Sequence, residues 1–225
     1  MLKQKRRLQK GAALVLSLLL LFSSLAGCGE QPPENASSGA RPTNTYTPLV
    51  NEDRYIVINM PKTLLGGKTA QELEVADKTA RTEIKDEETL NRTVYSALLA
   101  NEDGTFSYYL TPEQYPEFQA GLYWLGCLRD PYTAKISQDF VTAADYADFD
   151  ENGIPWGLIV SVDAETYHSL EMWYSALVTV TPAICLGRYQ VLCGIPGDEW
   201  AVHVTVKDAD TGEVISEHDF PTRGE

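Results

Sequence analysis

The chain has 225 residues, of which 44% are hydrophobic and 22% charged, and its formal net charge at pH 7 is −14. So strong a negative balance repels phosphate backbones and anionic lipid headgroups, which argues against nucleic acid and acidic membrane surfaces as ligands. With only three histidines, the chain also offers few residues for acid–base chemistry near neutral pH.

A basic segment, an apolar run and a cysteine motif follow one another at the N-terminus. Residues 1–10 hold five Lys/Arg and no acid, and the apolar run over 11–24 is shorter than the roughly 20 residues of a membrane-spanning helix. Leu25-Ala26-Gly27-Cys28 then resembles the bacterial lipoprotein signal, whose cysteine sulfur carries a diacylglyceryl thioether. The pattern predicts a signal peptide over 1–27 and a protein held at the extracytoplasmic face of the cell membrane by acyl chains on Cys28.

Removal of residues 1–27 would take five of the 18 Lys/Arg and none of the 32 Asp/Glu, leaving a net charge of −19. Residues 28–49 are rich in Pro, Ser, Asn and Gly without apolar periodicity, which predicts a flexible tether. Residues 50–225 are long enough for one well-packed domain. Its three cysteines leave at least one thiol unpaired, and spacing alone does not decide whether Cys185 and Cys193 form a disulfide or whether Cys127 is simply buried.

The domain opens with a predicted strand over 54–61, which Pro61 ends, and a predicted helix over 68–81 with weak caps. The first of two repeated units follows at 94–125. Two alternating runs flank the acidic turn Asn101-Glu102-Asp103-Gly104, which predicts a β-hairpin, and Thr111 with Gln114 predicts a capping box. The expected apolar stripe of the following helix is Tyr115, Phe118, Leu122 and Leu125.

The second unit, residues 149–177, repeats this order. Its turn is Asp150-Glu151-Asn152-Gly153, and Asp163 is the expected N-cap of its helix. The expected strand face is Trp156, Leu158, Val160 and Val162, and the helix stripe is Tyr167, Leu170, Tyr174 and Leu177. A third hairpin over 199–220 turns at 208–212 with no helix after it. The order β, α, ββ, α, ββ, α, ββ predicts an α+β fold, in which one antiparallel sheet of hairpins carries its helices on one face.

Four segments carry a resemblance to a protein family: LAGC, INMPKTLLGG, NEDGTFSYYLT and VKDADTGEVIS. With these, most of the chain after Cys28 resembles uncharacterised small lipoproteins of Gram-positive anaerobes. The segment YADFDENGIPWG departs from the pattern by being longer and more acidic. The resemblance implies an extracytoplasmic lipoprotein with a single α+β domain, and it implies no activity, cofactor or catalytic residue.

The segment 148–157, DFDENGIPWG, has the alternating acids of a calcium loop. A calcium loop beginning at Asp148 would need a bidentate glutamate at its twelfth position, where this chain has Ile159. Similar acidic turns precede Gly104 and Gly212, and Asp and Asn are common in turns because they bond to their own backbone. The comparison favours a hairpin turn over a metal site.

Catalysis would require side chains that meet only in three dimensions. The candidates are Glu113, Glu165, His168, His203 and His218, and the sequence favours a solvated surface position for each histidine. His203 alternates with valines on a predicted strand and should face away from the core. No metal-ligand spacing or cofactor motif is present, and the segment LLGGK lacks the spacing of a phosphate-binding loop.

Three adjacent aromatic pairs, Tyr108-Tyr109, Tyr123-Trp124 and Trp173-Tyr174, must each direct one ring away from its main stripe. They could form a surface for a glycan or peptide, although packing around the core is the favoured interpretation. The leading hypothesis is therefore a lipid-anchored envelope protein that acts as a binding or interaction module for an envelope protein, small molecule or glycan. The alternatives are an envelope hydrolase and an accessory ligand-binding protein for a transporter.

Overall fold

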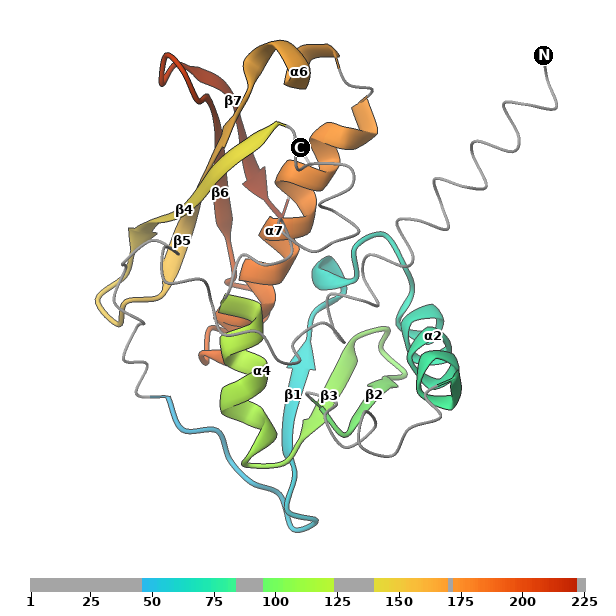
Figure 1. Ribbon diagram of the computed structural model, residues 1–225. Coiled ribbons are helices and arrows are strands. Elements are labelled where there is room, and N and C mark those ends of the chain that lie inside the picture. The colour runs from blue at the N-terminus through green and yellow to red at the C-terminus, as the bar shows by residue number, and fades with distance from the viewer. Residues whose placement is uncertain (1–45, 84–94, 124–139, 170–171, 222–225) are drawn as a thin grey trace, which may run out of the picture.

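The computed structural model describes residues 46–83, 95–123, 140–169 and 172–221, apart from the side chains of residues 172–175 and 177. It has the predicted order of hairpins and helices and the predicted α+β class (Figure 1). Cys28, Leu125, Cys127, Trp124 and Leu170 lie outside the described residues.

A small antiparallel sheet contains the first hairpin. Strand β1 (Ile56–Met60) pairs with β3 (Phe106–Leu110), and β2 (Ala97–Ala100) pairs with the other side of β3, giving the order β1-β3-β2. The hairpin turn closes as predicted, with the Gly104 N–H donating to the Asn101 carbonyl at 3.0 Å. Gly104 has φ 82°, which glycine adopts without steric cost.

Capping boxes begin two helices beside this sheet. At α4 (Gln114–Tyr123), the Thr111 hydroxyl accepts from the Gln114 N–H and the Gln114 side chain accepts from the Thr111 N–H, as predicted. Helix α2 (Ala70–Glu83) begins the same way, with Thr69 and Glu72 in the two roles. The expectation of weak caps for this helix was wrong, because TAQE at 69–72 is itself a capping-box sequence.

A second sheet contains the other two hairpins and is mixed. Its strands are β4 (Val141–Phe149), β5 (Pro155–Val162), β6 (Val202–Asp208) and β7 (Val214–Phe220), in the order β4-β5-β6-β7. Strands β5 and β6 are parallel, whereas the two hairpin pairs are antiparallel. The structure thus differs from the single antiparallel sheet expected, because the helical connection from residue 163 to 201 crosses over and returns the chain in the same direction.

The crossover consists of α6 (Ala164–Ser169) and the long α7 (Met172–Leu192). Asp163 caps α6 as predicted, its carboxylate accepting from the Thr166 N–H at 2.7 Å. Helix α7 continues well past residue 177, through Pro182, even though proline and the β-branched residues of this segment lower helix propensity. It ends at Gly194 (φ 93°), where the Ile195 and Gly194 N–H groups satisfy the last carbonyls in a Schellman motif.

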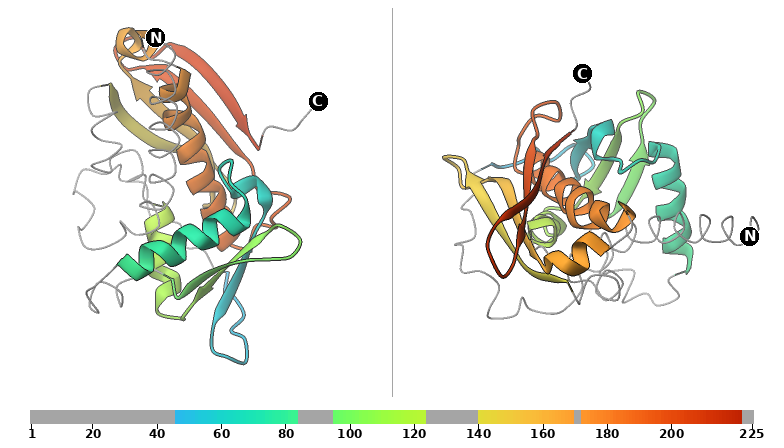
Figure 2. Two further views of the ribbon diagram at one scale, coloured as in Figure 1. Left: turned by 90° about the vertical axis from the view of Figure 1, so that its right-hand side faces the viewer. Right: turned by 90° about the horizontal axis from the view of Figure 1, so that it is seen from above.

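Helix α7 forms the centre of the core, because it contacts strands of both sheets as well as α4. It covers one face of the mixed sheet, while α2 lies beside the small sheet (Figure 2). Gly187 permits its closest contact: a Cβ there would lie 2.5 Å from Trp200 Cε3 and 2.7 Å from Leu64 Cδ2. The side chains of both sheets therefore share one buried hydrophobic cluster.

Candidate functional site

The five predicted acid–base candidates do not come together. Among the described residues, no hydrogen bond, ion pair or ring contact joins any two of Glu113, Glu165, His168, His203 and His218. His203 and His218 lie on neighbouring strands but on opposite faces, since His203 opposes Asp219 and His218 opposes Val204. The geometry of a two-acid or acid–histidine catalytic site is thus missing from this part of the chain.

His203 does have partners of its own. Its neighbours Val202 and Val204 are buried beneath α7, so the imidazole points to the opposite, outer face of the mixed sheet, as predicted. There His203 Nδ1 lies 2.8 Å from Asp219 Oδ1, and His203 Nε2 lies 3.6 Å from Glu217 Oε1. The hydrogen bond with Asp219 raises the pKa of His203, and the negative charge of Glu217 adds to the effect.

This pairing suits binding better than proton transfer. Both ring nitrogens of His203 are directed at carboxylates, so neither faces a serine, threonine or cysteine that it could activate. Glu217 and Asp219 were not predicted as partners of His203. The signal was available, because residues two apart on a strand share one face.

The outer face extends across all four strands and consists mostly of small and polar residues. By strand register it comprises Ala143, Asp145, Ala147, Gly157, Ile159, Ser161, His203, Thr205, Lys207, Glu217 and Asp219, together with two exposed apolar residues, Phe149 and Val214. In the described part of the chain no helix lies on this side of the sheet, whereas α7 lies on the other side (Figure 2).

Asp148 adds another carboxylate to the outer face. Its backbone has φ 54°, and Asp148 Oδ2 lies where a side chain at position 157 would be, 2.5 Å from an ideal Cβ built on Gly157. Gly157 in turn lies opposite His203. With Asp145, Glu217 and Asp219, four carboxylates accompany Lys207 and the imidazole, so the outer face is predominantly acidic.

The suspected calcium loop is the predicted hairpin turn. Asp150 Oδ1 accepts hydrogen bonds from the N–H groups of Asn152 at 2.9 Å and Ile154 at 2.8 Å, so its carboxylate holds the turn itself. Gly153 has φ 72°, as a tight turn of this kind requires. No group of three or more candidate metal ligands occurs within the described ranges.

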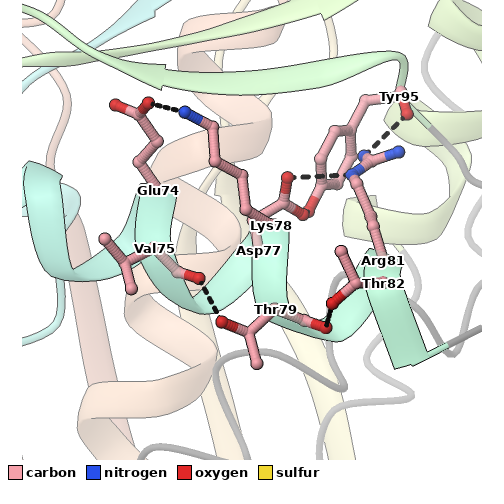
Figure 3. A network of polar contacts seen from close by, with 8 residues as sticks. All are labelled: Glu74, Val75, Asp77, Lys78, Thr79, Arg81, Thr82 and Tyr95. Carbon is pink, nitrogen blue, oxygen red and sulfur yellow. Dashed lines mark hydrogen bonds and ion pairs between the residues drawn. The ribbon is translucent and has the colours of Figure 1, made fainter.

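A second polar cluster fastens α2 to the small sheet (Figure 3). The buried Asp77 accepts from Arg81 Nε at 2.8 Å and from the Tyr95 hydroxyl at 2.7 Å. Arg81 also donates to the Tyr95 carbonyl at 3.0 Å and lies over the Tyr95 ring. Asp77, Arg81 and Tyr95 thus bind one another, which indicates that the cluster has a structural role.

Cys185 and Cys193 are both buried and form no disulfide with each other; Cys185 lies in α7, and Cys193 directly follows its last residue. Eight residues of helix separate Cys185 from Cys193 by about 12 Å, which is too far for a disulfide. Gln119 Nε2 donates to Cys193 Sγ at 3.3 Å.

Tyr108 and Tyr123, the described members of two of the aromatic pairs, pack against other rings. Tyr108 is 1% exposed and contacts the rings of Tyr95, Phe106 and Phe118 edge to face. Tyr123 stacks on Tyr146 at 4.7 Å. The side chains of Trp173 and Tyr174 lie outside the described set, so the core interpretation is favoured for the rings that the structure places.

No protein-family model, curated protein or solved structure matches this chain. Among the helices that the structure describes, none is both long enough and apolar enough to cross a membrane. The acidic outer face of the mixed sheet is therefore a candidate site identified by its geometry alone.

Proposed function

We propose that the protein is a lipid-anchored extracytoplasmic binding module of the cell envelope, whose partner docks on the outer face of the mixed sheet. The N-terminal pattern that ends in Leu25-Ala26-Gly27-Cys28 supports the anchoring. The observation that carries the binding role is a sheet face that no described helix covers. Four carboxylates lie on it, and two of them, Glu217 and Asp219, contact His203.

The charges of this face favour a partner segment with basic groups. Complementary charge steers association and selects among partners, even where it adds little to affinity. Both nitrogens of His203 already face carboxylates, so the imidazole serves this surface by orienting Glu217 and Asp219. The hydrolase and transporter alternatives have no comparable contact in their favour within the described residues.

The anchoring is tested by a Cys28→Ser variant. The wild-type protein should fractionate with membranes and incorporate labelled fatty acid, and the variant should do neither because it lacks the sulfur that forms the thioether. A Cys185→Ser variant is the matched control, since that thiol is buried and should not affect partitioning. Retention of Cys28→Ser in the membrane fraction would show that the lipoprotein interpretation is wrong.

The binding face is tested by photo-cross-linking in intact cells. A photoreactive amino acid at Thr205, in the middle of the outer face, should give a discrete product. The same amino acid at Val75, which is 64% exposed on α2, should not. Asn and Gln replacements of Asp145, Glu217 and Asp219 should abolish the Thr205 product. Equal labelling from both positions, or an unchanged product in the neutralised variant, would contradict the proposal.

A further inference from the structure

Arg188 is a buried cation with almost no hydrogen-bond partners. It lies on α7 and is 4% exposed, with its guanidinium carbon 5.6 Å from the centre of the Phe106 ring. Of its five N–H groups, one donates a hydrogen bond in the described structure, from Nη2 to the Leu64 carbonyl at 2.9 Å. The Nε atom is buried and without a partner, and no described carboxylate forms an ion pair with this side chain.

Such a group is costly, because a buried charge loses its hydration and an unpaired buried N–H loses a hydrogen bond. Arg81 shows that the same fold can satisfy an arginine completely, with a carboxylate, a carbonyl and an aromatic ring around it (Figure 3). Asp77, the buried carboxylate of that cluster, is already bonded to Arg81 and Tyr95. Within the described ranges, the positive charge of Arg188 therefore has no negative charge in contact with it.

The loop that Arg188 contacts carries a second cation, Lys68. The carbonyl that Arg188 contacts belongs to η1 (Lys62–Leu64), and the chain then passes through Gly66 and Gly67 to the start of α2. Lys68, half-buried in this loop, has a lowered pKa, chiefly through burial, with the charge of Arg188 contributing and Glu72 opposing. Lys68 stands two residues before the first residue of α2, so its ammonium lies near the positive end of that helix and feels the charge of Arg188.

The loop between η1 and Lys68 is open at its second glycine. Gly66 and Gly67 have φ 63° and 81°, and a Cβ built on Gly67 would meet no atom within 4 Å. Neither glycine N–H donates to another protein atom in the described chain. The carboxylate of Glu72 is hydrogen-bonded to Thr69, because the Thr69 N–H and hydroxyl both donate to Glu72 Oε2.

We infer that Arg188, Lys68 and the Gly66-Gly67 loop form a binding site for a small oxyanion, a phosphate or a carboxylate group. The planar guanidinium suits such groups because its parallel N–H donors match two oxygens. The bound anion supplies the negative charge that Arg188 lacks, and Lys68 and the glycine N–H groups complete its coordination from the solvent side. The site lies apart from the outer face of the mixed sheet and does not depend on the function proposed for that face.

Calorimetric titration of the purified protein tests the inference, with sodium phosphate in one arm and sodium acetate in the other, at ionic strength held constant with sodium chloride. We expect saturable binding of at least one anion, and the arm that saturates identifies it as phosphate-like or carboxylate-like. Lys68→Gln should raise the dissociation constant at least tenfold. Lys78→Gln removes the same charge from an exposed site on α2 and should leave the dissociation constant unchanged.

Arg188→Met should abolish saturation, and Lys68→Gln gives the decisive result if the core variant does not fold, because Lys68 is only half-buried. Absence of saturable binding in both arms would overturn the inference. Binding that is equally tight in wild type and Lys68→Gln would overturn it as well.

Discussion

Gln190 is the side chain that ties the crossover helix to the start of the parallel strand pair. It is fully buried on α7, and its Nε2 donates to the carbonyls of Pro155 and Ala201, both at 2.8 Å. Its Oε1 accepts from the Ala201 N–H at 3.1 Å. Pro155 begins β5 and Ala201 immediately precedes β6. The side-chain amide of Gln190 therefore takes the place of the hydrogen bonds that a neighbouring strand would make where these two strands begin.

Replacing Gln190 with leucine keeps the volume similar and removes all three hydrogen bonds. Each is worth about 1 kcal/mol net, and leaving the buried backbone groups of Pro155 and Ala201 unpaired adds to the loss. We expect the free energy of unfolding to fall by about 3–5 kcal/mol, a large share of the roughly 5–15 kcal/mol typical of a domain.

Urea denaturation followed by tryptophan fluorescence measures this loss as a lower midpoint with an unchanged m-value. Gln71→Leu, the same change at an exposed position of α2, is the matched control and should alter the stability by no more than about 0.5 kcal/mol. A loss below about 1 kcal/mol for Gln190→Leu would refute the reasoning, because it would mean that these backbone groups find other partners.

Three further predictions follow from packing and electrostatics. Gly187→Ala should destabilise by about 1–3 kcal/mol in the same urea assay, since its Cβ would lie 2.5 Å from a ring carbon, whereas Gly121→Ala, with nothing within 4 Å, should be neutral or stabilising. Asp219→Asn should lower the pKa of His203 in an NMR titration. Because the pKa of His203 is raised in the folded protein, its interaction with Asp219 stabilises the fold fully below the unfolded-state pKa of about 6.5. This stabilisation is lost as the pH rises through the folded-state pKa. A pKa of His203 that does not change in Asp219→Asn would contradict this reasoning. Tyr95→Phe should destabilise by about 1–3 kcal/mol, because it removes the hydroxyl bonded to the buried carboxylate of α2, and an unchanged urea midpoint would argue against that role.

Local signals in the sequence were sufficient for the elements of this fold. Acidic turns that end in glycine, between alternating runs, placed all three hairpins, and Thr111, Gln114 and Asp163 placed two helix starts. These features are read correctly because each depends on residues a few positions apart, whose preferences are set by backbone conformation and short-range hydrogen bonds.

Helix α7 shows where local signals end. Pro182, Gly187 and the β-branched residues around them oppose a helix, yet burial between two sheets stabilises it, which propensity alone could not indicate. Its length also decides that Cys185 and Cys193 cannot pair. The crossover it forms makes β5 and β6 parallel neighbours within the mixed sheet.

In the candidate sites, too, some features follow from the local sequence and others only from the tertiary structure. The sequence by itself determined that His203 faces away from the core and that Asp150 belongs to a turn, because strand alternation and turn chemistry are local properties. Only the tertiary structure placed Asp219 and Glu217 beside His203, and only it buried Arg188 where no carboxylate of the described residues reaches it. Strand register and helix packing bring together residues far apart in the chain, and their pairing is set by the burial of the whole core rather than by any short segment.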